Sequence, residues 1–272
     1  MNKEFAEFLQ KYKYLIEQDN FEDLYKYATE YDFSSELTTV LQQAGINPLL
    51  YMNKIPTHFA EFLTDCHFVI PDNITMIDHD AFSGSDIQSV TIPESCKLIR
   101  YCAFEYCNNL TTLIFKPGCE KIELQAFYRC NLLKTVNLPE TLKVIGQAVF
   151  FADYSLEHIK LPNSLARIDQ ESFSKTGLHE IEIPQYCGEL GANAFYGCNN
   201  MKTAVIHGGD IIYSGAFKSC KNLEKVVFGN NGSHFAPNIF DEDNPPKTFY
   251  VPKSNKYVLD YCKEHYFNIQ LI

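Results

Sequence analysis

Two pairs of ionisable side chains have the types and spacing that could do chemistry. His158 and Lys160 stand two residues apart, and Glu180 and Glu182 repeat that spacing 22 positions later. Alternate residues of a β-strand point to the same face, so adjacent strands would place a base beside an acid. Acid–base catalysis also needs a cleft that shifts pKa values, and an open sheet offers little burial. We therefore predict a structural ladder of opposite charges, and no enzyme activity.

Cysteines form a second candidate group. The chain has ten, and four of them lie three residues after a phenylalanine: Cys107, Cys130, Cys198 and Cys220. The same position is occupied elsewhere by small side chains, namely Ser85, Asp153 and Thr176. A position that accepts only small residues predicts buried, reduced thiols that act as small hydrophobic groups.

Two other roles for these cysteines depend on how the chain stacks. If successive repeats lie about 4.8 Å apart, Cys107 would lie over Cys130 and Cys198 over Cys220, within disulfide range under oxidising conditions. A zinc site needs four ligands, and a stacked pair supplies two. We predict no metal site and no cofactor.

The elements that position these groups follow from a repeat. A phenylalanine, usually preceded by alanine, recurs every 22 or 23 residues, at Phe82, Phe104, Phe127, Phe150, Phe173, Phe195 and Phe217. Each is followed by aliphatic residues with the spacing of a leucine-rich repeat strand, as in Leu133, Val136 and Leu138 before Pro139. Units this short cannot bury their own apolar faces, so they must stack as coils of a solenoid. The strands are expected to pair in parallel and form one sheet.

The sequence outside the repeat predicts a separate structure at each end of the array. Residues 1–66 show helical apolar spacing and predict either a helical cap on the first coil or a small separate domain. Residues 67–232 hold the seven coils. Residues 233–272 predict a capping coil with a strand at Thr248–Val251, a helix over about 254–266 and a final extended edge, which would close the exposed end of the array.

Composition restricts the partners and the location. The 272 residues carry a net charge of −11, which argues against nucleic acid and anionic membrane surfaces as partners. The segment Met1–Glu7 lacks the basic start and apolar run of a secretory signal, and no stretch reaches the roughly 18 to 20 apolar residues of a membrane span. We predict a cytoplasmic protein, or a secreted or cell-surface one if a leader was trimmed from this sequence.

The repeat unit, written Ile-x-x-x-Ala-Phe-x-x-Cys-x-x-Leu-x-x-Val-x-Ile-Pro, resembles the BspA-type leucine-rich repeat family over about residues 67–252. The helical start before Gly45-Ile46-Asn47-Pro48 is similar to that of bacterial and prophage-encoded members. The resemblance implies an α/β, right-handed solenoid with a concave parallel sheet, an irregular convex side and caps at both ends. It also implies non-enzymatic binding of proteins or host surfaces, and it supplies no catalytic motif to carry over.

The residues between the inward aliphatics of each strand should line the concave sheet. Those predicted to bind are Thr112, Ile114, Thr135, Asn137, His158, Lys160, Glu180, Glu182, Thr203 and Val205. This polar face of mixed charge suits a protein or peptide ligand; a glycan ligand, or a solvated face without any ligand, is the alternative. The second functional hypothesis is a secreted or surface-displayed adhesin that binds a host protein or glycan.

Overall fold

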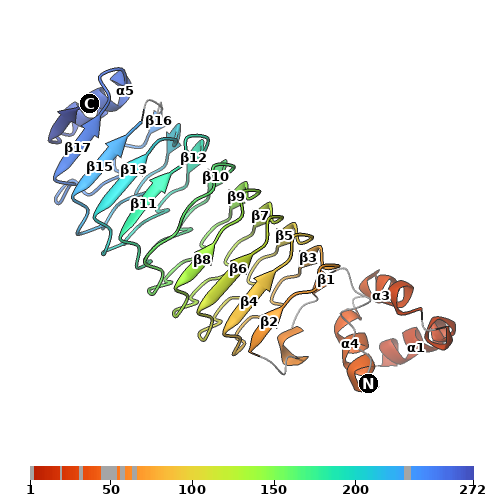
Figure 1. Cartoon of the computed structure of the whole chain (residues 1–272). Coiled ribbons are helices and arrows are strands. Elements are labelled where there is room, and N and C mark those ends of the chain that lie inside the picture. The colour runs from red at the N-terminus through yellow and green to blue at the C-terminus, as the bar shows by residue number, and fades with distance from the viewer. Residues whose placement is uncertain are drawn as a thin grey trace.

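The chain forms an elongated solenoid of stacked parallel strands, preceded by a group of helices (Figure 1). The computed structural model describes residues 3–18, 20–30, 33–43, 54–55, 59–62, 66–229 and 234–272. The Gly45-Ile46-Asn47-Pro48 segment, where the sequence predicts that the helical run ends, lies outside these ranges. The expected leucine-rich repeat solenoid is confirmed, because hydrogen-bonded strands recur at the predicted interval along the array.

Longer strands form one side of the solenoid, which we call the long-strand face. Its first sheet has four parallel strands, β2 (His67–Val69), β4 (Ser89–Ile92), β6 (Thr112–Phe115) and β8 (Thr135–Asn137). Its second sheet has five, β11 (Glu180–Ile183), β13 (Thr203–Ile206), β15 (Lys225–Phe228), β17 (Thr248–Val251) and β18 (Ile269–Leu271). Inward residues are buried and outward residues are not, as the alternating pattern predicted.

The prediction of a single sheet on this face was wrong. Residues 156–161 hold the expected aliphatics Leu156, Ile159 and Leu161, yet they form no strand between β8 and β11. Ile159 is half-buried, whereas its equivalent Ile181 is buried. The break lies where the spacing changes: Leu156 follows Phe150 by six positions and Leu178 follows Phe173 by five, although the same five-position spacing from Phe82 to Ile87 accompanies no break.

A second side was expected to be irregular, and it is regular. In the described part of the chain, nine two-residue strands pair in parallel along the array: β1 (Lys54–Ile55), β3 (Met76–Ile77), β5 (Leu98–Ile99), β7 (Lys121–Ile122), β9 (Val144–Ile145), β10 (Arg167–Ile168), β12 (Glu189–Leu190), β14 (Ile211–Ile212) and β16 (His234–Phe235). In most of them a buried aliphatic at the second position fixes the register, as Ile122 over Ile145 shows. Unlike the long-strand sheets, this ladder runs unbroken past the coil at 156–161.

The turn that holds each repeated phenylalanine also has a regular backbone. The residues two before and two after the phenylalanine have positive φ angles, for example Gln125 (57°) and Arg129 (58°) around Phe127. A left-handed conformation costs a non-glycine residue roughly 1–2 kcal/mol. Hydrogen bonds between coils offset that cost: the Phe127 N–H donates to the Val149 carbonyl at 3.0 Å, and other coils repeat the bond.

The phenylalanine rings form a continuous stack through the core. Neighbouring ring centroids lie 4.6 to 5.7 Å apart with interplanar angles of at most 18°, from Phe82 to Phe240. Phe240 extends the stack beyond the last unit that the sequence pattern identified. Phe59, in a 3-10 turn at Phe59–Phe62, meets Phe82 edge-on at 5.9 Å and covers the first coil.

The small-residue slot after each phenylalanine is a buried hydrogen-bonding position. The thiol of Cys107 donates to the Phe82 carbonyl at 3.0 Å, and Cys130, Cys198 and Cys220 each make the same contact with the phenylalanine carbonyl of the coil before their own. All four cysteines are buried thiols, as predicted. The slot therefore favours a small side chain that can donate a hydrogen bond to a phenylalanine carbonyl, of the preceding coil for the cysteines and of its own coil for Thr176.

Asp153 is the exception in this slot. Its side chain is fully buried, and neither carboxylate oxygen has a hydrogen-bond partner. Burial raises the pKa of Asp153 well above the ordinary value for an aspartate. The group is therefore held as a neutral acid in the coil where the long-strand face is interrupted.

The N-terminal helices have a core of their own. They are α1 (Lys3–Lys11), α2 (Lys13–Glu17), α3 (Phe21–Glu30) and α4 (Ser34–Gln43). Phe5, Phe8, Leu24 and Leu37 are among the buried residues of this cluster, which shares no residue with the solenoid core. The boundaries predicted near 66 and 232 remain predictions.

The C-terminal elements close the array as predicted. β17 pairs with β15 and then with β18, so both edges of β17 are hydrogen-bonded. Asn255 caps the N-terminus of helix α5 (Lys256–Glu264), because its side chain accepts a hydrogen bond from the Val258 N–H. Phe267 stacks on Phe249 at 4.6 Å and covers the apolar end of the core.

We predict that Phe150→Ala lowers the free energy of unfolding by about 3–5 kcal/mol, because it removes a ring from the middle of the stack and leaves a cavity. Urea unfolding at neutral pH would measure the change. Tyr186→Ala serves as the matched control, since Tyr186 is 74% exposed. An equal loss in the two variants would contradict the role given to the stack.

We also predict that Asp153→Thr raises the free energy of unfolding at pH 7 by about 1–3 kcal/mol, because a hydroxyl in this slot can donate to a carbonyl as Thr176 does. Above about pH 4 the unfolded aspartate releases its proton while the folded one keeps it, so wild type loses stability as pH rises. Unfolding of both proteins at pH 4 and pH 7 tests this. The stability difference should be larger at pH 7; a pH-independent difference contradicts the prediction.

Candidate functional site

The interruption of the long-strand face opens a pocket. The pocket has a volume of about 400 Å³ and lies between the coil of residues 156–163 and strands β11 and β13. Within the described residues, no backbone hydrogen bond joins residues 158–161 to a neighbouring coil. Their main-chain donors and acceptors are therefore available to water or to a ligand. We call this feature the break pocket.

The break pocket combines an apolar floor with a charged rim. Ile159, Leu161 and Ile181 form its aliphatic floor, in which Ile159 is half-buried and the other two are buried. Lys160 and Glu182 are exposed at its edge and bring opposite charges. Such a site can bury an aliphatic side chain and pair with polar groups on either side of it.

The predicted binding residues divide at the break. Lys160, Glu180, Glu182, Thr203 and Val205 all line the break pocket. Four others lie on the first sheet: Thr112 and Ile114 on β6, and Thr135 and Asn137 on β8. His158 is exposed on the interrupted coil but does not line the pocket. The continuous binding face that the sequence predicted is thus two surfaces separated by the break.

The ladder of opposite charges predicted between residues 158 and 160 and residues 180 and 182 also differs from the observed ion pairs. Among the ion pairs of the described residues, Glu182 pairs with His207 Nε2 at 3.2 Å, and none joins Lys160 to Glu180 or Glu182. The reason is the missing strand: without a hydrogen-bonded register, the side chains at 158 and 160 are not held opposite those at 180 and 182. Lys160 remains available for a charged partner.

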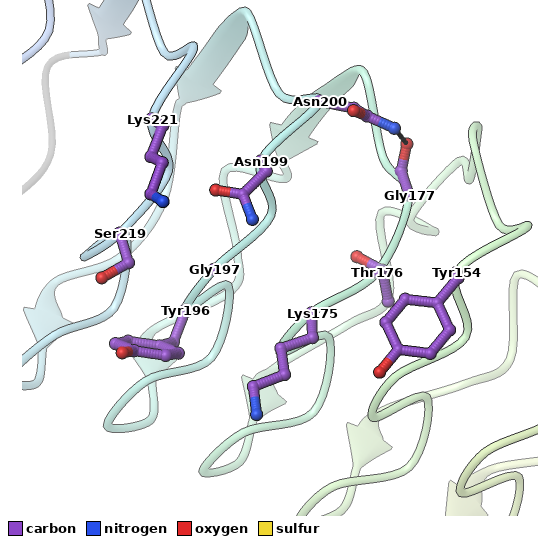
Figure 2. A pocket seen from close by; sticks show the side chains of 10 residues that line it. All are labelled: Tyr154, Lys175, Thr176, Gly177, Tyr196, Gly197, Asn199, Asn200, Ser219 and Lys221. Carbon is purple, nitrogen blue, oxygen red and sulfur yellow. Dashed lines mark hydrogen bonds between the residues drawn. The ribbon is translucent and has the colours of Figure 1, made fainter.

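A second pocket, of about 500 Å³, lies where the phenylalanine turns lead into the strands. Figure 2 shows that its lining side chains come from successive coils and include the rings of Tyr154 and Tyr196 and the ammonium groups of Lys175 and Lys221. Sequence reasoning missed this site, because its residues come from variable turn positions. We call it the turn channel.

Gly177 explains how two coils approach closely in the turn channel. A Cβ atom at this position would collide with the carbonyl oxygen of Tyr154. The Gly177 carbonyl in turn accepts a hydrogen bond from the Asn200 side chain at 3.5 Å (Figure 2). The floor of the channel is therefore backbone, while its sides offer aromatic rings, amides and amines.

Comparison with known proteins settles the family. Residues 58–165 and 147–270 match the model of the BspA-type leucine-rich repeat region, which spans most of the chain. The chain belongs to the BspA-type leucine-rich repeat family. The resemblance seen in the repeat letters is thereby confirmed. None of the curated proteins matches the sequence.

Solved structures of bacterial leucine-rich repeat proteins are similar to this BspA-type chain. A leucine-rich cell surface protein from Faecalibacterium prausnitzii is 20% identical, with a TM-score of 0.53, over 81% of this chain and 83% of the other. A leucine-rich repeat protein from T. pallidum is 18% identical, with a TM-score of 0.45, over 75% and 85%. The pneumococcal vaccine antigen PcpA is 16% identical, with a TM-score of 0.42, over 81% and 83%. At these identities the first match supports the fold alone.

No helix among the described residues combines the length and the apolar character that crossing a membrane requires.

Proposed function

We propose that this BspA-type chain is a non-enzymatic scaffold that binds an extended peptide segment of a partner protein on its long-strand face. The observation that carries the proposal is the break pocket, where the half-buried Ile159 lies beside backbone that, among the described residues, makes no hydrogen bond to a neighbouring coil. An extended segment fits because the face is built from strands, and its alternate side chains would point toward the pocket.

Each part of the break pocket suits a different part of the proposed peptide. The aliphatic floor at Ile159 and Ile181 favours a buried apolar side chain, which acts as the anchor. Lys160 and Glu182 favour ligand residues of opposite charge on either side of it, and such rim charges mainly set orientation and rate. The unpaired backbone of residues 158–161 can hydrogen-bond to the ligand main chain. The net charge of −11 disfavours nucleic acid and anionic membranes in this role.

The test is to select binders from a random-peptide display library on the wild-type chain and measure their dissociation constants by fluorescence anisotropy. Thr203→Arg should weaken binding at least about tenfold, because the longer side chain fills the pocket. Thr112→Arg is the matched control: it adds the same charge to the same face on β6, and it should leave affinity within about twofold.

Two results would count against this proposal. Equal loss in Thr203→Arg and Thr112→Arg would move binding away from the break pocket to the face as a whole. Unchanged affinity in Thr203→Arg, with thermal melting showing that the variant is folded, would reject the pocket as the site.

A second function, glycan binding by a surface-displayed adhesin, is favoured by the turn channel. Tyrosine rings can pack against the apolar face of a sugar, while Asn199 and Lys221 can hydrogen-bond to its hydroxyls. Tyr154 is 59% exposed, although large hydrophobic surfaces are usually buried.

For the turn channel, we predict that Tyr154→Ser lowers affinity for glycans retained on a glycan array at least about tenfold, because the stacking surface is lost. Isothermal titration with the retained glycan would measure the change. Tyr186→Ser, an exposed tyrosine outside the channel, is the control. Absence of any retained glycan, or equal loss in both variants, would reject this second function.

A further inference from the structure

We infer that Glu157, His158 and His179 form a binding site for a transition-metal ion of the zinc type at the edge of the break. One ligand atom from each of the three side chains lies within 4.8 Å of the others. Glu157 and His158 come from the interrupted coil and His179 from the residue just before β11, so the site bridges two coils. It is separate from the peptide and glycan sites proposed above.

The donor set decides which metal fits. Two imidazoles and one carboxylate match the ligands that Zn²⁺ uses in three-residue sites, whereas Mg²⁺ and Ca²⁺ prefer oxygen donors alone. Zinc bonds of about 2.0–2.2 Å place neighbouring ligand atoms roughly 3.5 Å apart in a tetrahedral site. To bind zinc, the three ligand atoms must therefore approach one another by little more than about 1 Å. A side-chain rotation is enough for a movement of that size.

The backbone holds the two coils ready for this closure. The His179 N–H donates to the Glu157 carbonyl at 3.0 Å, which is the last backbone link between the coils before the break begins. The rings of His158 and His179 lie 5.4 Å apart, centroid to centroid, at an angle of 69°. Glu157 and His158 are exposed and His179 is half-buried, so an ion can enter from solvent and keep one coordination position open.

A second cluster of potential ligands is less suited. Asp80, Cys102 and Glu105 also bring ligand atoms together. A thiol must lose its proton to bind zinc. Burial and the neighbouring Glu105 raise the pKa of Cys102 to about 12, which opposes that step. The two clusters differ in sulfur content, so spectroscopy can tell them apart.

The test uses the full chain, reduced and stripped of metal, titrated with Co²⁺ and then with competing Zn²⁺. We expect one Co²⁺ per chain, with d–d absorption and no thiolate-to-cobalt charge transfer. Changes around a metal site that leave its ligands intact already cost 10–100-fold in affinity, so His158→Gln and His179→Gln should each lose at least about tenfold. His207→Gln, on the same face outside the cluster, should bind like wild type.

Three outcomes would overturn the inference. Thiolate charge transfer would assign the metal to a cysteine site. Unchanged affinity in His158→Gln and His179→Gln, or an equal loss in His207→Gln, would show non-specific uptake by surface histidines. Melting of the metal-free variants at the wild-type temperature confirms that a lost affinity reflects a lost ligand, and added Zn²⁺ should raise the melting temperature of wild type only.

Discussion

Stacking between neighbouring coils is the constraint on which the rest of this protein depends. A coil of 22 or 23 residues has no interior of its own, so each phenylalanine is buried against the rings of the coils before and after it. Backbone hydrogen bonds join the coils along the long strands, the short strands and the turns. The left-handed residues of the turns are tolerated because they align these bonds. The two ends need covers for the same reason, and Phe59 and Phe267 provide them.

The interruption at residues 156–161 shows where such an array can acquire specificity. Two of the three ladders pass through this coil without change: the short strands pair from β9 to β10, and Phe150 stacks on Phe173. Only the long-strand side loses its backbone hydrogen bonds to the neighbouring coils. Losing a few backbone hydrogen bonds on one side leaves Ile159 only half-buried beside main-chain groups without a partner coil, while the other ladders keep the array intact. The break pocket and the Glu157, His158 and His179 cluster both arise from this one departure from the repeat.

The same coil carries the buried Asp153, which takes the place of a residue that would donate a hydrogen bond to the preceding coil. A neutral acid without a partner is a stability cost in the interior. This coil therefore lacks two kinds of stabilising interaction: the hydrogen bonds of a long strand at residues 156–161, and a hydrogen bond from the side chain at position 153. Natural repeat arrays commonly depart from local rules at functional positions, and this concurrence is the reason to look for function here.

Much of the fold could be predicted from the sequence, because the repeat interval, the alternation within Leu133, Val136 and Leu138, and the small residues after each phenylalanine are all local patterns. They determined the family, the solenoid, the buried thiols and the C-terminal strand and helix. The regular ladder of short strands was missed, since two-residue strands leave almost no alternation to read. Phe240 was missed as well, because its unit lacks the usual letters around it.

The candidate sites were decided by tertiary structure. The residue types at positions 156–161 match those at the equivalent positions of the neighbouring coils. Nothing in them indicates that Ile159 is only half-buried, beside a backbone without hydrogen bonds to the next coil. Whether a strand forms depends on hydrogen bonds to the coils on both sides, and those bonds are set by the relative placement of three coils. The sequence by itself thus determined which residues face outward. Only the stacked structure decided that Lys160, Glu180 and Thr203 share a pocket, and that His158 meets His179 rather than Glu180.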